Sequence, residues 1–333
     1  MGREYDDLDE EGQVEVLREV ALAAAGHFGL TVDRLEVLLH GYNTTFRVDT
    51  TDTRTIALRV NTNSKSTPGQ IRGQQAWQHA LATQSDVRVP DPLRALNGDW
   101  FATAHSAALG RLAHATASSW LAGDDIATEV DVDQAHALGV AMATLHEHAE
   151  GWALPPNADL PTFDTPLFGD ADRLTSYEGF DEEAKATVTT AMDRCTAAME
   201  RVCAGQRLIP LHADLHGGNL KWNGGRLSIF DFDDAGLSVP AVDLAISTFY
   251  LADRHGPTEA ALREGYAQRR PLPALDRADF ESVVASRQLL LANDILVSST
   301  HAMRQQAADY AMTTIARLEG WLRTGVFTRL SAS

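Results

Sequence analysis

The sequence predicts an α+β fold of two lobes, in which a short hinge joins a β-rich N-terminal lobe to a mostly helical C-terminal lobe. Three observations support this. Strand-like apolar runs separated by turns fill the early part of the chain, helical periodicity dominates the rest, and one β-rich island between Leu208 and Phe232 interrupts the helices. A chain of 333 residues, 44% of them hydrophobic, can bury a core in each lobe.

The predicted N-terminal lobe is a small antiparallel sheet with one inserted helix. Apolar residues recur at helical spacing from about Glu11 to Phe28, and a second helix is expected from about Gly69 to Thr83. The Asn97-Gly98-Asp99 stretch is a strong hairpin signal. Strands are expected at 35–40, 45–49, 55–60, 92–96 and 100–104.

The stretch from Ser118 to Asp124 is the best candidate for a linker between the lobes. It divides the chain into an N-terminal lobe of residues 1–117, a hinge of residues 118–124 and a C-terminal lobe of residues 125–333. Beyond the hinge, helices are expected at 133–150, 181–203, 257–269 and 276–297, with a last long run ending at 323.

The charge balance restricts the possible partners. With 28 basic against 46 acidic residues, the net charge is −18, whereas nucleic-acid binding needs clustered Lys and Arg. We therefore expect no nucleic-acid partner. An acidic surface is compatible with a cationic small substrate, although solubility alone or a high-salt habitat explains the balance equally well.

The compartment is predicted from the cysteines and from the lack of a targeting pattern. Cys195 and Cys203 lie in one predicted helix and fit neither a disulfide framework nor a zinc site. No stretch has the pattern of a signal peptide or a membrane span. A cytoplasmic protein without a membrane partner is therefore expected, and its oligomeric state stays open.

The chemistry is predicted to lie in the β-rich island, where polar side chains converge. A loop from His212 to Asn219 is followed by a hairpin with an Asn223-Gly224 turn, which brings Asp231 back toward Asn219. Amide and carboxylate oxygens suit Mg²⁺, which takes substrate phosphates as its other ligands. A separate carboxylate, Asp214, is available to accept the proton of an attacking hydroxyl. Phosphoryl transfer needs little more than these groups.

These motifs resemble a known family. The pattern His-x-Asp-x-x-x-x-Asn, a hairpin and a metal-binding Asp is shared with eukaryotic-like protein kinases. The sequences of residues 212–219, 230–236 and 239–245 resemble motifs of the aminoglycoside phosphotransferase and choline kinase-like family. The resemblance covers most of the chain, from about Leu39 onward. The resemblance implies a protein-kinase-like fold, the cofactors ATP and Mg²⁺, and a small-molecule hydroxyl acceptor such as an amino alcohol, sugar or aminoglycoside.

The resemblance also implies a role for each matching position. Asp214 would be the catalytic base or would orient the hydroxyl, and Asn219 and Asp231 would hold Mg²⁺. His212 would brace the loop by hydrogen bonds, and Asp243 would hold the same loop from the following helix. Nucleotide-binding residues would lie in the loop over the phosphates, in the third strand and in the hinge: Gly41, Tyr42, Asn43, Thr44, Thr45, Arg59, Ser119 and Leu121.

One departure leaves alternatives open. Gln74 stands near the place where the family has a Glu that pairs with the phosphate-contacting cation, here Arg59. An amide can hydrogen-bond Arg59 but supplies no charge, so a degenerate nucleotide-binding member is an alternative. His216 is expected in loop structure or in chemistry, and Asp233 and Asp234 in solvent or facing a cationic substrate.

Two other activities are alternatives. A protein Ser/Thr kinase of the same superfamily is possible on the motif alone, but only twelve positions separate Asp231 from Asp243, which leaves little room for a peptide-docking segment. A non-haem Fe(II) oxygenase is a remote alternative, because His212-x-Asp214 matches part of a two-His-one-carboxylate triad. That activity would need a β-barrel around the motif.

Overall fold

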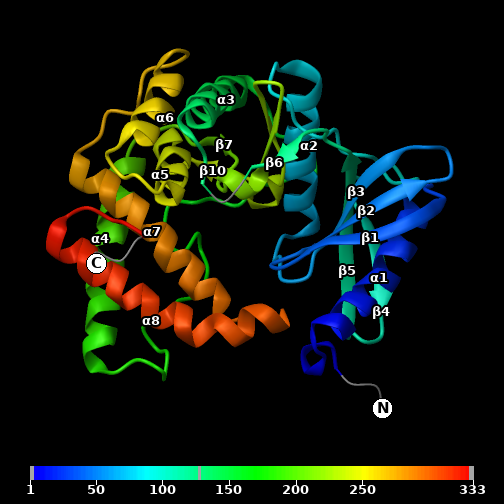
Figure 1. Cartoon of the computed structure of the whole chain (residues 1–333), viewed down its shortest axis with the longest axis horizontal. Helices are drawn as coiled ribbons and strands as arrows, with labels where there is room; N and C mark the ends of the chain where they lie inside the picture. Colours follow the sequence, from blue (N-terminus) through cyan, green and yellow to red (C-terminus); the bar gives the residue numbers. More distant parts are fainter. Residues whose placement is uncertain (1–3, 127–128, 330–333) are drawn as a thin grey trace.

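The computed structural model describes residues 4–126 and 129–329 and contains the two lobes that the sequence predicts (Figure 1). The N-terminal lobe holds a five-stranded antiparallel sheet in the order β1-β2-β3-β5-β4. Its elements are the helices α1 (Glu10–His27) and α2 (Pro68–Gln84) and the strands β1 (Val32–His40), β2 (Thr44–Thr50), β3 (Thr55–Val60), β4 (Ala102–Ser106) and β5 (Arg111–Ser119).

One predicted strand is wrong. Residues 92–96 form no strand, and the last hairpin is instead β4–β5, with Ser106 opposite Arg111. The segment does run beside β5, because the Leu93 amide donates to the Ala117 carbonyl at 2.8 Å. It begins at Pro92 and is preceded by Pro90, and because proline cannot donate to a ladder, only an isolated bridge at Pro92 forms. The Asn97-Gly98 turn exists, with Gly98 at φ +84°.

The sheet and α1 enclose the N-terminal core. Inward positions of β2 alternate with outward ones along the whole strand, as a half-buried strand requires. Phe46 and Val48 therefore pack with Leu58 of β3 and with Leu17 of α1, all of them fully buried. This packing gives the third strand a rigid base, and its outward-facing Arg59 is aimed at the other lobe.

The C-terminal lobe is helical around the β-rich island. Its helices are α3 (Val132–Gly151), α4 (Glu182–Cys203), α5 (Pro240–Tyr250), α6 (Pro257–Ala267), α7 (Arg277–Ile295) and α8 (His301–Thr324). The island holds β7 (Ile209–Leu211), β8 (Leu220–Asn223) and β9 (Arg226–Ile229). β7 pairs with β10 (Gly236–Ser238), and β8 pairs with β9 and with β6 (Asp124–Asp125). The central helix is α7, which is buried along most of its length.

The expected linker overlaps the sheet. Ser118 and Ser119 belong to β5, opposite Ala57 and Ile56 of β3, so the chain leaves the sheet at Trp120. The Trp120 ring lies 5.1 Å from the Arg47 guanidinium of the N-terminal lobe and 5.8 Å from the Lys221 ammonium of the C-terminal lobe. Cation–π contacts from both lobes therefore hold the Trp120 ring at the junction between them.

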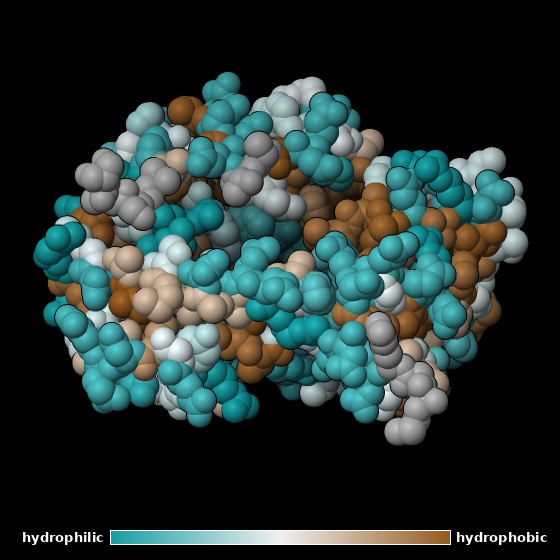
Figure 2. Space-filling model, turned by 60° about the horizontal axis from the view of Figure 1, so that its bottom comes forward, coloured by the Kyte–Doolittle hydropathy of each residue, from teal (hydrophilic) through white to brown (hydrophobic). Residues whose placement is uncertain are grey.

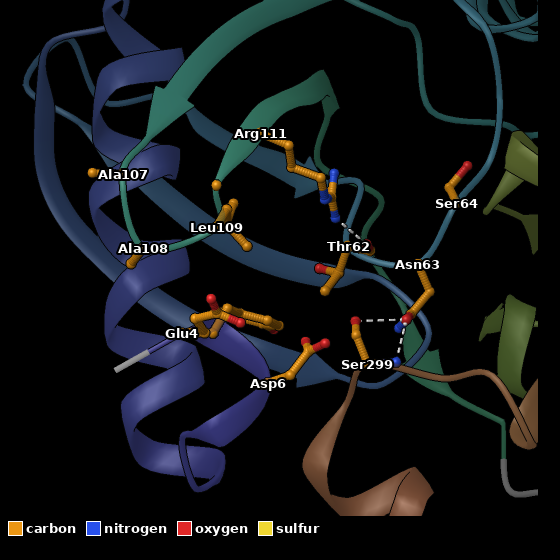
Figure 3. A pocket seen from close by; sticks show the side chains of 12 residues that line it. Glu4, Asp6, Thr62, Asn63, Ser64, Ala107, Ala108, Leu109, Arg111 and Ser299 are labelled. Carbon is orange, nitrogen blue, oxygen red and sulfur yellow. Dashed lines mark hydrogen bonds between the residues drawn. The ribbon is translucent and has the colours of Figure 1, made fainter. Parts of the chain in front are cut away.

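A second contact joins the lobes away from this linker. Asn63, just after β3, donates to the Thr300 hydroxyl at 2.9 Å and accepts the Ser299 amide at 2.7 Å (Figure 3). Gln13 of α1 donates to the Ser299 carbonyl at 2.9 Å. A cavity of about 950 Å³ opens beside these residues, and no residue of the predicted site lines it. The cavity therefore adjoins the lobe contact and not the predicted reaction centre.

The surface is mostly polar. Figure 2 shows hydrophilic residues over much of one face, with hydrophobic residues gathered toward the N-terminal lobe. Exposed leucines of that lobe include Leu38 and Leu39 on the edge strand β1. Over residues 4–126 and 129–329, no helix has both the length and the apolar character that crossing a bilayer requires.

Two glycines let α3 and α6 pack closely. A Cβ on Gly139 of α3 would lie 2.0 Å from the Leu262 carbonyl oxygen, and a Cβ on Gly265 of α6 would lie 2.1 Å from the His136 carbonyl oxygen. The two backbones thus touch where only hydrogen fits. This contact sets the spacing of His146 and Tyr266, the side chains that α3 and α6 send toward the centre of the lobe.

We expect Gly139→Ala to lower the free energy of unfolding by about 1–3 kcal/mol, because the added methyl group meets backbone that has to move. The matched control is Gly320→Ala in α8, where a Cβ meets nothing within 4 Å. That change should raise the free energy of unfolding by about 0.5–1 kcal/mol. Urea denaturation followed by circular dichroism measures both, and equal effects would contradict the close packing of α3 on α6.

Candidate active site

The loop 212–219 is held by one buried carboxylate. Asp243, on α5, accepts the His212 amide at 3.2 Å and the Ala213 amide at 2.7 Å. Ala213 has φ +61°, a left-handed conformation that costs a non-glycine residue about 1–3 kcal/mol. The carboxylate fixes the two successive amides that lead into this kink, so the sequence-based role of Asp243 is confirmed.

Asp243 is itself fixed from behind. His146 places Nε2 3.0 Å from the Asp243 carboxylate and Nδ1 2.9 Å from the Tyr266 hydroxyl, and the three side chains are fully buried. One turn along α5, Ser247 donates to the Leu215 carbonyl at 2.8 Å. The sequence showed no sign of this chain of bonds, because its members come from three separate helices.

His212 braces the loop, as predicted. Its Nε2 lies 2.9 Å from the Phe230 carbonyl oxygen and its Nδ1 accepts the Asp214 amide at 3.3 Å. An imidazole that donates at one nitrogen and accepts at the other is neutral. Burial lowers the pKa of His212, with Asp243 and Asp214 opposing, which agrees with this neutral form. His212 therefore links the loop to the strand that leads to Asp231.

Both carboxylate oxygens of Asp214 are engaged. Oδ2 accepts the Asn219 amide group at 2.8 Å and lies 3.4 Å from His216 Nε2, while Oδ1 is paired with the Arg287 guanidinium. Burial alone would raise the pKa of Asp214, but Arg287 and His216 outweigh it and hold the pKa well below its usual range. Asp214 is thus fixed in place and ionised.

The structure adds Arg287 and Tyr250 to the site. The Arg287 Nη2 donates to the Tyr250 hydroxyl at 3.1 Å, and the Tyr250 ring stacks on the His216 ring with centroids 4.3 Å apart. His216 also accepts the Gly218 amide at 3.0 Å, so it shapes the loop as well as contacting Asp214. Asp243, Ser247 and Tyr250 recur at the spacing of one helix face, which is the signal that was available in the sequence.

The hairpin brings Asn219 and Asp231 to one end of the β8–β9 ribbon. The Phe230 amide donates to the Asn219 carbonyl at 3.0 Å, so Phe230 lies opposite Asn219 and Asp231 follows it in the chain. Asp231 has φ +67°, a second left-handed residue in the site. The Asn219 amide group faces Asp214, and its side-chain oxygen accepts no hydrogen bond from the residues that the structure describes.

The side-chain oxygens of Asn219 and Asp231 suit a divalent metal ion whose remaining ligands come from a bound molecule. Among residues 4–126 and 129–329, no group of three or more His, Cys, Asp or Glu side chains could hold a metal by itself. One carboxylate and one amide oxygen are the protein share that Mg²⁺ commonly takes beside substrate phosphates. A metal here would therefore depend on a phosphate-bearing partner.

Arg59 bridges the lobes to this carboxylate cluster. Its Nη1 pairs with Asp231 and lies 2.6 Å from Asp233 Oδ1. Burial and the neighbouring Asp233 raise the pKa of Asp231 well above its usual value, with Arg59 opposing. Burial would also raise the pKa of Asp233, but Arg59 lowers it below the usual value. Asp233 is therefore buried and paired, and it is not solvated.

Negative charge is in excess around the site. The carboxylates of Asp214, Asp231, Asp233 and Asp234 face two guanidinium groups, those of Arg59 and Arg287. Burial, followed by Asp233 and Asp214, raises the pKa of Asp234 well above its usual range. A further cation would relieve this repulsion, because opposite charge favours the ionised carboxylates.

The predicted phosphate loop lies against this cluster. Asn43 donates to Asp233 Oδ2 at 2.6 Å and accepts the Thr62 amide at 2.9 Å. The Gly41 carbonyl accepts the Thr300 hydroxyl at 2.5 Å. Thr44 and Thr45 begin β2, where Thr45 pairs with Arg59 across the ladder, and the Tyr42 carbonyl accepts the Asn63 amide group at 2.8 Å. Asn43 is thus the loop residue that binds the acidic cluster, while the Gly41 and Tyr42 carbonyls bind Thr300 and Asn63.

Gln74 does not contact Arg59, contrary to expectation. Its amide nitrogen donates to the Asp233 carbonyl at 2.5 Å and to the Ala235 carbonyl at 3.4 Å. The carboxylate partners of Arg59 are Asp231 and Asp233, from the C-terminal lobe. Gln74 therefore supports the backbone that carries the acidic cluster.

The two hinge residues differ in what they can offer a ligand. Ser119 donates its amide to the Asp91 carbonyl at 2.9 Å, and its hydroxyl accepts the Asp91 amide at 2.8 Å. The backbone amide of Ser119 is thus already used within the protein. Leu121 lies beyond β5, in the irregular segment before β6, and is half-buried.

A two-lobed fold with this loop and hairpin defines a phosphotransferase, and comparison with known proteins assigns the family. The model of the phosphotransferase enzyme family matches residues 34–280, so the chain belongs to that family. An uncharacterized protein of Deinococcus radiodurans is 30% identical over 314 residues, covering 91% of this chain and 86% of that protein.

Solved structures agree on the fold. A microcompartment-associated aminopropanol kinase has a TM-score of 0.77 and 27% identity, over 94% of this chain and all (100%) of its own. Amicoumacin kinase, solved with AMP-PNP, Ca²⁺ and Ami, has a TM-score of 0.67 and 17% identity, over 90% of this chain and 92% of its own. The oxygenase alternative is wrong, because the motif lies in this kinase-like fold and the described residues form no β-barrel around it.

We expect Asp243→Asn to lower the free energy of unfolding by about 2–4 kcal/mol and to reduce turnover, because a buried amide cannot accept from two backbone amides and His146 at once. Ser247→Ala is the matched comparison on the same helix face. It removes one hydrogen bond to the same loop and should cost about 1 kcal/mol. Chemical denaturation measures both, and equal losses would show that Asp243 does not hold the loop.

Proposed function

We propose that this phosphotransferase uses ATP and Mg²⁺ to phosphorylate a hydroxyl group of a small amino alcohol. The observation that carries the proposal is the junction of Asp214, Asn219 and Asp231, two of which share a hydrogen bond. Phosphoryl transfer is catalysed mainly by positioning and by neutralising charge on the phosphates, and these side chains are suited to both tasks.

Asn219 and Asp231 would hold Mg²⁺ between the ATP phosphates, where the ion would neutralise the charge that develops during transfer. Arg59 would contact the same phosphates and the loop from Gly41 to Thr45 would cover them. The hinge at Leu121 would face the adenine. Support comes from the excess of carboxylates around Arg59 and from the free side-chain oxygen of Asn219.

Asp214 would orient the acceptor hydroxyl and take its proton late in the transfer. The lowered pKa of Asp214 makes it a weak base, with burial opposed by Arg287 and His216. A loose transition state needs little help from a base before the bond to phosphorus forms, so a fixed, ionised carboxylate is sufficient. Position matters more here than basicity.

A cationic acceptor fits the charge around Asp214. Asp234 feels the charges of Asp214 and Arg287 and has no hydrogen-bond partner among the described residues. An ammonium group beside Asp234 would put a hydroxyl two or three carbons away near Asp214. The similarity to an aminopropanol kinase supports an acceptor of this size. A protein acceptor is disfavoured, because α5 begins only nine residues after Asp231.

The first test separates chemistry from nucleotide binding. Asp214→Asn should leave the affinity for ATP largely intact and reduce turnover by roughly 10²–10⁴, the usual effect of a positioned base. Asp231→Ala should abolish Mg²⁺-dependent ATP binding. Isothermal titration with and without Mg²⁺, together with a coupled ADP assay, measures both. Asp193→Asn, exposed on α4, is the control and should behave as wild type. Wild-type turnover in both site variants would overturn the proposal.

The second test concerns the acceptor. Aminopropanol and propanediol differ in the ammonium group, so we expect the wild type to have a much lower KM for aminopropanol. Asp234→Asn should narrow that difference by roughly tenfold or more, the effect of a lost charge-assisted hydrogen bond. Asp193→Asn, exposed on α4, is the control and should leave the difference in KM unchanged. Labelling of a generic protein with no turnover of small alcohols would instead favour a protein kinase.

A further inference from the structure

Arg287 is a buried cation that no motif accounts for. Its side chain is 6% exposed, it comes from the middle of the central helix α7, and its guanidinium pairs with Asp214 Oδ1. Nε and Nη2 also donate to the Tyr250 hydroxyl at 3.3 and 3.1 Å. The carboxylates of Asp214 and Asp234 raise the pKa of Arg287 against the effect of burial, so the group stays charged.

Stability does not explain this arrangement. Removing two charges from water costs several kcal/mol per ion, and replacing a buried pair with apolar side chains is often neutral or stabilising. Arg287 lies on a helix that is buried along most of its length, where an apolar side chain would avoid this desolvation cost. The geometry at Asp214 offers a better explanation.

We propose that Arg287 is a positioning residue for phosphoryl transfer, which sets the orientation of the Asp214 carboxylate and acts through it. This inference rests on the proposed function. Asn219 fixes Oδ2 from the loop, and Arg287 fixes Oδ1 from α7, so the carboxylate is held by two elements that are far apart in sequence. Oδ2 faces both Asn219 and His216, whereas Oδ1 has Arg287 as its partner and keeps a lone pair that an acceptor hydroxyl can use.

Tyr250 links Arg287 to His216, which also lies beside the Asp214 carboxylate. Its hydroxyl holds the guanidinium and its ring stacks on the His216 imidazole, whose Nε2 lies 3.4 Å from Asp214 Oδ2. Arg287 thus holds Oδ1 directly, while Tyr250 supports His216, which lies beside the Asn219-bound oxygen Oδ2. Without Arg287, the carboxylate keeps only Asn219 and His216 as partners and gains rotational freedom. A displacement of about 1 Å at a reacting group is enough to reduce turnover about 10²-fold.

A double-mutant cycle tests whether Arg287 acts through Asp214. We compare the wild type with Arg287→Gln, Asp214→Asn and the double variant, and measure kcat for transfer from MgATP to aminopropanol. Arg287→Gln should reduce kcat about 10²-fold in the wild-type background and by less than about threefold in the Asp214→Asn background. The dissociation constant of MgATP should not change. An equal loss in both backgrounds, or an unchanged kcat in Arg287→Gln, would overturn the inference.

Two milder variants keep the test informative if Arg287→Gln is unstable. Tyr250→Phe retains both charges and the ring, and should reduce kcat roughly 3- to 10-fold through the lost hydroxyl. Arg287→Lys keeps the charge but not the planar fork, and should fall between the wild type and Arg287→Gln. Full wild-type kcat in both variants would also overturn the inference.

The double-mutant cycle remains informative even if the proposed acceptor is wrong. If the wild type does not phosphorylate aminopropanol, the proposed acceptor is wrong, and the four proteins are then compared in MgATP hydrolysis, with water as the acceptor. Loss of the Arg287 effect in the Asp214→Asn background still supports the positioning role in that assay. Equal losses in both backgrounds still exclude it.

Discussion

The whole site depends on the carboxylate of Asp243. Ala213 adopts a left-handed conformation that a β-carbon disfavours, and the loop holds this shape because Asp243 accepts the two successive amides that lead into the kink. Asp214 follows the kink directly, so the kink sets the direction in which the chain reaches it. His146 and Tyr266 fix Asp243 in turn, so the packing of α3 on α6 determines where the reacting carboxylate lies.

The second constraint is electrostatic. Four carboxylates and two guanidinium groups are gathered in one place, and the raised pKa values of Asp231 and Asp234 reflect burial together with this mutual repulsion. Such a site is unfavourable by itself and becomes favourable when cations arrive. The acidic cluster thus has a use in binding that it does not have in folding, and the same excess of charge suits both a metal ion and an ammonium group.

The sequence predicted what is local and missed what is distant. The loop, the Asn223-Gly224 hairpin and the first three strands follow from spacing and turn chemistry, because the interacting residues are near neighbours in the chain. The predicted strand at 92–96 does not form because Pro92, and Pro90 just before it, cannot donate to a ladder. Arg287 and His146 could not be predicted as site residues, since each reaches the loop from a helix 66 or more positions away, and only packing decides which way a side chain on such a helix points.

Gln74 shows why a departure from a family pattern has to be weighed against local charge. A glutamate here would face the carbonyl oxygens of Asp233 and Ala235, which need a donor, and would add a fifth carboxylate to the cluster. The amide group donates to those carbonyls at no cost in charge. Arg59 meanwhile obtains its carboxylate partners from Asp231 and Asp233, so the pairing across the lobes is kept with different residues. The glutamine is therefore consistent with a working phosphotransferase, because the support that a glutamate would give Arg59 comes here from the C-terminal lobe.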